Sequence, residues 1–257
     1  MARVFITGSA DGLGQMAARL LVAEGHHVVL HARHAARARE ALAAVRGAET
    51  AVSGDLTKLA EMRSVAEQVN ALGPFDAVIH NAGIGYRERR RIATTDGLPH
   101  VLAVNTLAPY VLTALIEKPQ RLVYLSSGMH QGGDASLYDL EWNARPWNGS
   151  QAYSDSKLHD VILAFAVARL WPTVRSNALE PGWVPTKMGG AGAPDDLEAA
   201  PKTQVWLATS ADPAASVSGE YFYHQRLRRP LPATRDSEVQ DRLLGECARL
   251  TSVPFPA

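Results

Sequence analysis

The sequence predicts an α/β fold in which a doubly wound parallel sheet lies between two layers of helices. Short β-branched runs alternate with longer helical patterns along the chain, as in repeated βαβ units. Most of these runs are apolar on both faces, as strands covered by helices on both sides must be. The length of 257 residues is one that such folds commonly fill as one unit, so we expect a single domain over residues 1–257.

The predicted elements follow one another without a long linker. Strands are expected at about 3–7, 27–31, 50–53, 77–80, 121–126 and 174–179. Helices are expected at 12–24, 35–45, 59–72, 96–116 and 151–170, and the last carries a wide apolar stripe that could pack on a neighbour. After Leu227 we expect a surface helix followed by a loose tail.

Three predicted loops follow strands, at 87–91, 129–150 and 185–201. The carboxyl edge of an open α/β sheet is where ligands bind, so we expect the loops at 129–150 and 185–201 to shape a substrate pocket. The arginine-rich loop at 87–91 is interpreted as a solvated segment.

The composition argues against several classes of function. The 26 basic and 26 acidic side chains cancel, so no nucleic-acid partner is expected. The single cysteine, Cys247, can form neither an internal disulfide nor a shared metal site, which favours a reducing cytoplasm and no metal. The apolar run from Val4 to Ile6 is too short for a signal peptide or a membrane span, so neither is expected.

A glycine-rich turn, TGSADGLG, runs from Thr7 to Gly14 between the first predicted strand and helix. Glycines allow the sharp turn and let a pyrophosphate approach the helix N-terminus, where free N–H groups and the helix dipole favour an anion. Glycines alone fit an ordinary strand-to-helix turn equally well. The position of the turn, after the first strand of a βαβ pattern, favours dinucleotide binding.

The end of the second strand indicates which dinucleotide is bound. Ala32 stands where an enzyme that prefers NAD usually has a carboxylate, and Arg33 follows it. An arginine there can hold the 2′-phosphate of NADP(H), so we predict NADP(H) rather than NAD(H). Asp11 in the glycine turn would oppose this assignment if it lay near the same phosphate.

Tyr153 and Lys157 are four residues apart near the start of a predicted helix, so both point from one face. A tyrosine with an ordinary pKa near ~10 exchanges protons poorly at neutral pH. A lysine cation at roughly 4.5 Å would supply on the order of 3.7 kcal/mol, nearly the three pKa units required. Taken alone, however, the pair is more commonly an exposed helix-surface couple.

Three further polar residues lie at positions where each has both a structural and a functional interpretation. Ser126 and Ser127 end the fifth predicted strand, where a hydroxyl could bind a substrate carbonyl or simply begin the next turn. Asn105 interrupts the apolar part of a long helix, so its amide must find partners, either as a structural node or in a water relay.

Together these motifs resemble the compact, single-domain branch of the short-chain dehydrogenase/reductase family, from Val4 to about Tyr223. One position departs from the family pattern Asn-Asn-Ala-Gly, where His80 replaces the first asparagine. The matching segments are the turn at 7–14, Asp55-Leu56, His80-Asn81-Ala82-Gly83, Asn105, Ser127, Tyr153-x3-Lys157 and Pro181-Gly182-Trp183-Val184-x-Thr186.

The resemblance implies a Rossmann fold and an oxidoreductase that transfers hydride between a nicotinamide and a small carbonyl or alcohol substrate. It implies that Tyr153 is the general acid–base and Ser127 orients the substrate. Lys157 would hold the nicotinamide ribose and lower the tyrosine pKa, and Asn105 would anchor a relay water. Family members are often homodimers or homotetramers, so we expect an oligomer. With Arg33, Tyr153 and Lys157, the implied cofactor contacts are Gly8, Ser9, Gly12, Leu13, Gly14, Asp55, Leu56, Asn81, Ala82, Gly83, Pro181, Gly182, Val184 and Thr186.

The serine and the tyrosine are 26 residues apart, farther than in many family members. The extra stretch at 134–149, with Trp142 and Trp147, is similar to the insertion of retinol dehydrogenase-like and protochlorophyllide reductase-like members. It favours a lipophilic or aromatic carbonyl substrate, although the tryptophans more commonly pack such a loop onto the body.

Two other functions share part of these motifs. A non-catalytic regulator that senses NADP(H) would need only the cofactor site, so the intact Ser127, Tyr153 and Lys157 argue against it. A sugar epimerase or dehydratase shares the Tyr-x3-Lys pattern. It normally has a differently spaced glycine turn and a longer carboxyl-terminal domain, which argues against this function as well.

Overall fold

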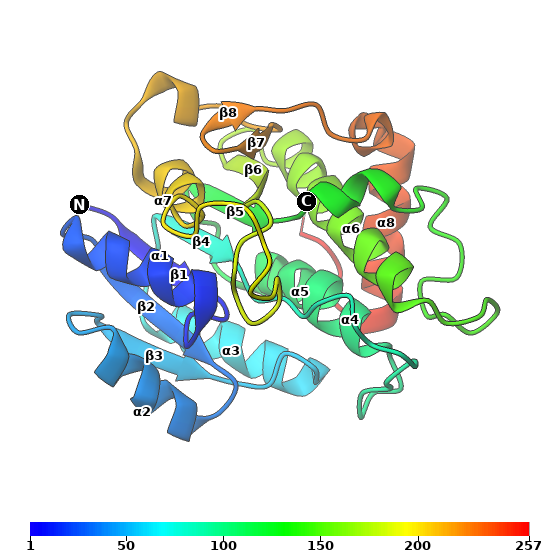
Figure 1. Ribbon diagram of the computed structural model, residues 1–257, viewed down its shortest axis with the longest axis horizontal. Coiled ribbons are helices and arrows are strands. Elements are labelled where there is room, and N and C mark those ends of the chain that lie inside the picture. Colours follow the sequence, from blue (N-terminus) through cyan, green and yellow to red (C-terminus); the bar gives the residue numbers. More distant parts are fainter. Residues whose placement is uncertain (257) are drawn as a thin grey trace.

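A central sheet of eight strands, in the order β3-β2-β1-β4-β5-β6-β7-β8, organises the molecule (Figure 1). The structure is a computed structural model that describes residues 1–256, so Ala257 of the predicted domain lies outside the described residues. Strands β1 to β7 pair in parallel and β8 pairs antiparallel with β7, which confirms the doubly wound parallel sheet. The strands are β1 (Arg3–Ile6), β2 (His27–Ala32), β3 (Thr50–Ser53), β4 (Ala77–His80), β5 (Arg121–Leu125), β6 (Arg175–Glu180), β7 (Tyr221–Tyr223) and β8 (Arg226–Leu227).

The order of the strands reverses at β1, which lies between β2 and β4. Phe5 of β1 pairs with Val29 on one side and with Val78 on the other. In a parallel sheet this reversal opens a crevice at the carboxyl ends of the strands. The glycine turn that follows β1 therefore lies at the crevice.

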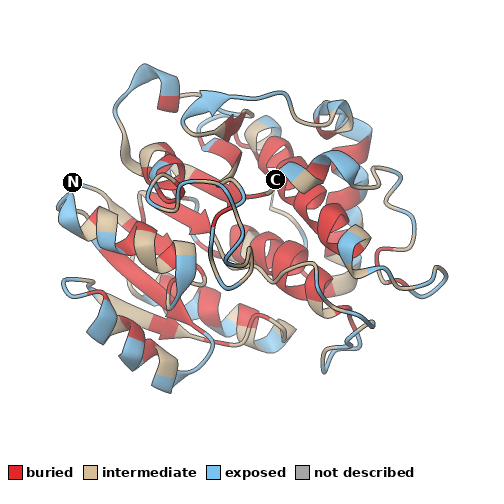
Figure 2. Cartoon of the chain, viewed as in Figure 1, coloured by how far each residue is buried: buried red, intermediate tan, exposed pale blue. Residues whose placement is uncertain are grey.

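Helices cover both faces of the sheet and each face has its own apolar core. On one face α1 (Gly12–Ala23), α2 (Ala35–Ala44) and α7 (Lys202–Thr209) contribute buried residues to a core with β1 and β2. On the other, α3 (Leu59–Ala71), α5 (Ala108–Leu115), α6 (Gly149–Leu170) and α8 (Ser237–Thr251) do so. Figure 2 shows β1, β2, β4, β5 and β6 largely buried between these helices. No described helix is both long and apolar enough to cross a membrane.

The helix predicted at 96–116 is wrong in two respects. Residues 96–99 are not helical, because the chain turns at Gly97, where φ is +79°, and Pro99 forms an isolated bridge with Ala93. The helical part then changes character along its length. Segment α4 (His100–Leu102) leads into a π-helical turn, η1 (Ala103–Leu107), before α5 begins. Such a turn contains an extra residue and is often found at functional sites.

The predicted loop at 129–150 is shorter than expected. A 3₁₀ helix, η2 (Gly128–Gly132), follows β5, and α6 begins at Gly149. The side chain of Asn148 accepts a hydrogen bond from the Gln151 N–H and so caps α6. Two further 3₁₀ turns, η3 (Pro213–Ala215) and η4 (Pro232–Arg235), lie before β7 and after β8 in the chain.

The apolar stripe of α6 does not form an exposed face. Helix α8 and η4 of the same chain pack against α6, and residues such as Ile162 and Phe165 belong to the shared core. The stripe is therefore covered within the chain.

The carboxyl-terminal tail is packed, contrary to the loose tail predicted from its proline-rich sequence. The ring of Phe255 stacks on that of Trp171 with 5.1 Å between centroids. The Trp171 indole N–H donates to the carbonyl oxygen of Pro256 at 3.1 Å, and the Tyr110 hydroxyl donates to that of Val253 at 2.8 Å. Aromatic side chains outside the tail hold it in place.

We predict that Phe255→Ala lowers the free energy of unfolding by about 2 kcal/mol, because it removes partly buried apolar area and an aromatic stack. Urea denaturation measures the change. Leu227→Ala, which truncates an exposed side chain, should change stability by less than about 0.5 kcal/mol. Equal stability of the Phe255 variant and the unmodified protein would show that the tail does not stabilise the fold.

Candidate active site

The glycine turn is tied to the end of β4. The Thr7 Oγ1 accepts hydrogen bonds from the N–H groups of Asn81 and Ala82, both at 3.0 Å. The Asn81 side-chain amide donates to the Thr7 carbonyl oxygen at 2.9 Å. Gly8 has a φ of +63°, and a β-carbon there would lie 2.8 Å from the Ala82 Cα. The close approach of these two segments therefore requires glycine at position 8.

His31, which belongs to none of the sequence motifs, holds the same turn from the other side. Its Nδ1 accepts a hydrogen bond from the Gly8 N–H at 3.0 Å, so its Nε2 donates to the Gly54 carbonyl oxygen at 3.0 Å. Burial lowers the pKa of His31 to about 4, so the ring is neutral at physiological pH. Ser9 is structural, since its Oγ donates to the Ile6 carbonyl oxygen and accepts from the His31 N–H.

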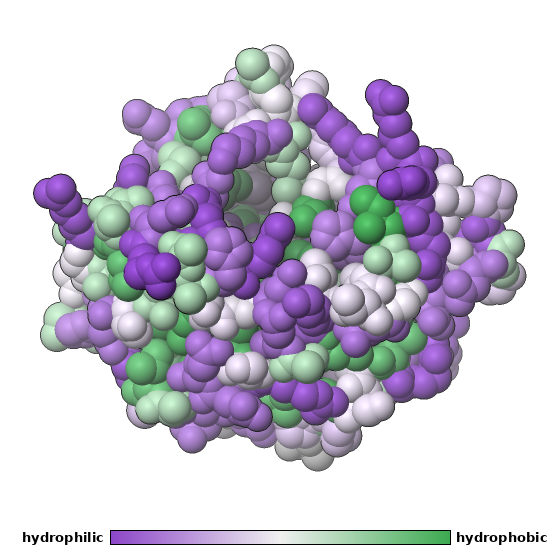
Figure 3. Space-filling model, turned by 90° about the horizontal axis from the view of Figure 1, so that it is seen from below, coloured by the Kyte–Doolittle hydropathy of each residue, from purple (hydrophilic) through white to green (hydrophobic). Residues whose placement is uncertain are grey.

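A cavity of about 800 Å³ opens at the carboxyl edge of the sheet and continues from the glycine turn to Tyr153. A hollow with a mostly hydrophilic rim is visible on the face drawn in Figure 3. The residues predicted from the motifs that line the cavity are Gly8, Gly12, Leu13, Arg33, Asp55, Leu56, Asn81, Ala82, Gly83, Tyr153, Lys157, Pro181 and Thr186. Within the described chain, the predicted site residues that do not line it are Ser9, Gly14, Asn105, Ser127, Gly182 and Val184.

Cationic side chains gather at the end of the cavity next to β2. Arg33 follows the strand, and Arg37, four residues further along the chain, lines the same cavity. Arg33 precedes α2 whereas Arg37 lies in its first turn, so no helical spacing relates the two arginines and only the structure brings Arg37 to the cavity. Asp11 does not act here as an unpaired anion, since Lys187 hydrogen-bonds its carboxylate and Arg37 lies 3.7 Å away. The Lys187 hydrogen bond lowers the pKa of Asp11 below its ordinary value.

The other end of the cavity contains Tyr153 and Lys157. The ammonium of Lys157 lies 5.8 Å from the centre of the Tyr153 ring. It donates hydrogen bonds to the Leu125 carbonyl oxygen at 2.7 Å and to Asp160 Oδ2 at 2.8 Å. Both side chains of the Tyr-Lys pair are buried, so the pair is not the exposed surface couple that the spacing alone suggested.

Side chains from two loops contact Tyr153. Met188, in the segment after β6, has its sulfur 3.9 Å from the Tyr153 oxygen. The ring of Tyr86 meets that of Tyr153 edge to face, with 5.6 Å between centroids. Met188, Ile84 and Val104 give this end of the cavity an apolar wall.

The two serines at the end of β5 have different structural roles. The Ser126 hydroxyl donates to the Lys157 carbonyl oxygen at 2.7 Å and lines the cavity. The Ser127 hydroxyl accepts from the Met129 N–H at 3.3 Å and caps η2. In this structure Ser127 thus begins the following turn, which was the alternative interpretation of its position.

Asn105 lies in the π-helical turn η1 and is fully buried. Its Oδ1 accepts from the Ile84 N–H at 2.8 Å. Its Nδ2 donates to the Ile84 carbonyl oxygen and to Ser156 Oγ, each at 3.0 Å. Asn105 is therefore a structural node that joins the segment after β4 to α6.

His80, the departure from the family motif, has an apolar and aromatic environment. Its Nε2 lies 3.0 Å from Thr113 Oγ1, and its ring lies 4.7 Å from that of Tyr124. Burial lowers the pKa of His80 to about 3, so it is neutral. One ring nitrogen of His80 is thus paired beneath the sheet edge, whereas its buried Nδ1 has no hydrogen-bond partner among the described residues.

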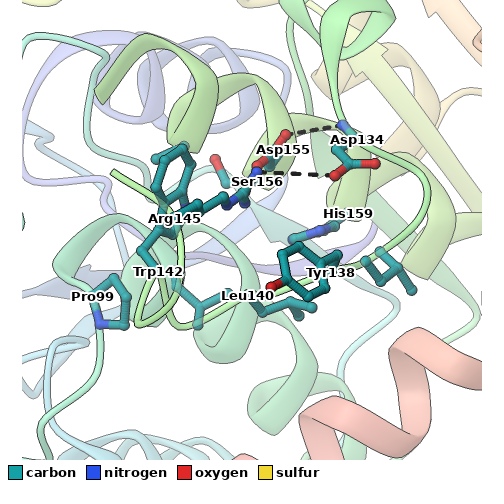
Figure 4. A pocket seen from close by; sticks show the side chains of 12 residues that line it. Pro99, Asp134, Tyr138, Leu140, Trp142, Arg145, Asp155, Ser156 and His159 are labelled. Carbon is teal, nitrogen blue, oxygen red and sulfur yellow. Dashed lines mark hydrogen bonds and ion pairs between the residues drawn. The ribbon is translucent and has the colours of Figure 1, made fainter. Parts of the chain in front are cut away.

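The insertion at 134–149 is fixed to α6 by a partly buried ion pair (Figure 4). Arg145 donates to Asp155 Oδ2 at 2.7 Å, and its guanidinium lies 3.6 Å from the centre of the Trp142 ring. The other oxygen of Asp155 accepts from the Asp134 N–H at 2.9 Å. Trp142 and Trp147 contact each other edge to face. The Trp147 indole N–H donates to the Glu88 carbonyl oxygen at 2.9 Å, and Trp142 lines a small pocket with Leu102 and Ala152. In this structure both tryptophans therefore pack the insertion onto the body.

The residues of the cavity fit a nicotinamide dinucleotide. The glycine turn leaves backbone N–H groups of the first turn of α1 for a pyrophosphate, and two arginines lie at the end of the cavity next to β2. The doubly wound sheet and this cavity define a dinucleotide-binding α/β protein of the Rossmann class.

Comparisons with known proteins identify the family within this class. The chain matches the family model described as short chain dehydrogenase over residues 2–196. It is 45% identical over 260 residues to an uncharacterized oxidoreductase of Emericella nidulans, covering 100% of this chain and 99% of that protein. A short-chain dehydrogenase of Penicillium rubens is 41% identical, with full coverage of both chains. Human retinol dehydrogenase 13 is 30% identical, covering 99% of this chain and 86% of that protein.

Solved structures agree with this result. A crystal structure of an uncharacterized protein from Mycobacterium paratuberculosis superposes with a TM-score of 0.84 at 25% identity, covering 100% of this chain and 96% of that one. A short-chain dehydrogenase/reductase from Serratia marcescens shares the fold, with a TM-score of 0.67 at 23% identity, covering 86% and 95%. This chain belongs to the short-chain dehydrogenase/reductase family of NAD(P)-dependent oxidoreductases.

His31 makes the stability of the fold depend on pH. The unfolded chain binds a proton at this residue below about pH 6.5, whereas the folded chain does so only near pH 4. The stability contributed by neutral His31 is thus present above pH 6.5 and is lost as the pH falls toward 4. At pH 5 the loss from this residue is about 2 kcal/mol.

The free energy of unfolding should decrease between pH 7 and pH 5. We therefore predict that His31→Gln makes this decrease smaller by about 2 kcal/mol, as measured by urea denaturation at both pH values. The matched control is His27→Gln, at the exposed end of the same strand, which should keep the original slope. Identical slopes for all three proteins would contradict the role of His31.

Proposed function

We propose that this chain is an NADP(H)-dependent oxidoreductase that interconverts a carbonyl and an alcohol, with Tyr153 as the general acid–base. The observation that carries the proposal is that one cavity joins the glycine turn to the buried Tyr153 and Lys157 pair. When bound, the nicotinamide supplies or accepts the hydride. Residues of this chain carry out the rest of the chemistry.

In the direction of reduction, Tyr153 gives its hydroxyl proton to the carbonyl oxygen, and in oxidation it takes the proton back. The ammonium of Lys157 has three donors, of which Leu125 and Asp160 each accept one. The third donor is left for the ribose of the nicotinamide. The Ser126 hydroxyl, which lines the cavity, joins the predicted Ser127 as a candidate to orient the substrate oxygen.

Two observations support NADP(H). Arg33 and Arg37 both line the adenosine end of the cavity, and each can bind a 2′-phosphate. Asp11, which could have opposed the phosphate, is already paired with Lys187 and Arg37.

The apolar wall beside Tyr153 favours a lipophilic or aromatic carbonyl substrate. Tyr86, Met188, Val104 and Ile84 offer aromatic and aliphatic surface to a bound molecule. Relatives that include retinol dehydrogenases 13 and 14 support this substrate class.

A cytoplasmic location and a homodimer or homotetramer remain part of the proposal. The covered stripe of α6 does not supply an oligomer interface.

We predict that Tyr153→Phe lowers kcat by about 10³-fold, since it removes the transferable proton and little else. The assay is a panel of aldehydes, ketones, quinones and alcohols followed by NADPH absorbance. Tyr138→Phe, at an exposed tyrosine, should retain full activity. Turnover of the Tyr153 variant close to that of the unmodified enzyme would refute the acid–base role. NADPH binding without turnover on any substrate would instead support a regulator.

We also predict that Arg33→Ala raises the KM for NADPH by roughly 10-fold to 100-fold, because it removes a charged partner of the 2′-phosphate. The KM for NADH, which lacks that phosphate, should change by less than about 2-fold. Steady-state kinetics with both nucleotides provide the measurement, and Arg39→Ala, at an exposed arginine of α2, is the matched control. A preference for NADH in the unmodified enzyme would defeat the assignment.

A further inference from the structure

Asp160 is a buried carboxylate of α6 that belongs to none of the motifs. It follows Lys157 by three residues, and its Oδ2 accepts a hydrogen bond from the Lys157 ammonium at 2.8 Å. The side chains of Asp160 and Lys157 are only 3% and 6% exposed, so the two charges face each other away from solvent. The Leu125 carbonyl oxygen accepts a second hydrogen bond from the same ammonium. The position of the ammonium is thus fixed by two partners within the protein.

Both members of the pair are ionised at neutral pH. Burial by itself would lower the pKa of Lys157, but the charge of Asp160, the ionised form of Tyr153 and the hydrogen bond to Asp160 together raise the pKa above its ordinary value. Burial raises the pKa of Asp160 to about 6, and Lys157 opposes this rise. The carboxylate at position 160 is therefore negative above that pH.

The titratable groups of the neighbouring strands do not replace this charge. Burial raises the pKa of Tyr124 in β5 and of Tyr221 in β7, so both are neutral. His80 in β4 is neutral because burial lowers its pKa to about 3. Glu180 at the end of β6, whose pKa burial also raises, acts on Tyr221. On α6 itself, Asp155 is paired with Arg145 and His159 with Thr106.

We propose that Asp160 positions the ammonium of Lys157 and offsets part of its positive charge, so that Asp160 sets the pH range in which Tyr153 exchanges its proton. A cation acts on a neighbouring phenol through its Coulomb field, and a carboxylate 2.8 Å from that cation opposes the field. The lysine alone would favour the ionised tyrosine more strongly than the pair does. This inference rests on the proposed acid–base role of Tyr153.

The test is Asp160→Asn, which keeps an oxygen acceptor for the ammonium and removes the negative charge. We expect the ionisation midpoint of Tyr153 to move to lower pH by about one unit. The first measurement uses the cofactor-free protein. The tyrosinate absorbance is titrated in each protein and in its Tyr153→Phe counterpart, and the difference isolates Tyr153. The second measurement is the pH profile of kcat/KM.

The matched control is Asp155→Asn, which removes another buried carboxylate from the same helix but one that is paired with Arg145. This control should leave the midpoint within about 0.3 unit of the original. If Asp160→Asn does not fold, Asp160→Ser removes the same charge and is expected to give the same direction of shift.

A midpoint that is unchanged or moves to higher pH in the Asp160 variant would overturn the proposal, as would an equal shift in the Asp155 control. Full activity of Tyr153→Phe would instead overturn the proposed function. The absorbance titration would then still report whether Asp160 acts on Tyr153, so the two failures can be distinguished.

Discussion

The structure depends on the burial of helix α6 along most of its length, from Ala152 to Val167. A helix that is buried on all sides is normally apolar, yet this one contains several polar and charged residues, which must find partners inside the protein. Its buried charged side chains and Ser156 each have a specific neighbour. Lys157 binds Asp160 and Leu125, Asp155 binds Arg145, and Ser156 binds Asn105. These contacts fix α6 to β5, to the insertion and to the π-helical turn.

The requirement to pair buried polar groups links distant segments of the chain to the active site. Asn105 can reach both Ile84 and Ser156 because the π-helical turn places it between the end of β4 and α6. Elsewhere along the cavity, His31 connects the glycine turn to the end of β3 in the same manner. The walls of the cavity are therefore held in place by hydrogen bonds between separate segments of the chain, and not by one rigid element. This network fixes the helix that carries Tyr153 and Lys157.

The sequence motifs locate much of the site. The glycine turn, Arg33, the Asn81 segment and Tyr153 with Lys157 meet in one cavity because parallel strands bring their carboxyl ends to the same edge. Asp160 and His31 could not be found in this way. Their importance comes from partners at 2.8 Å and 3.0 Å that the spacing of the sequence does not reveal. For Ser127 the sequence left two roles open, and in the folded chain its hydroxyl caps η2.

The sequence by itself determined the fold class, the strands from β1 to β6 and the position of the cofactor turn, because hydrophobic periodicity and turn residues are local properties. Only the tertiary structure decided three other features. These are the π-helical turn that interrupts the helix around Asn105, the packing of the tail on Trp171 and the buried carboxylate beside Lys157. Each of these features depends on burial or on contacts between residues far apart in the chain, and a local pattern encodes neither of them.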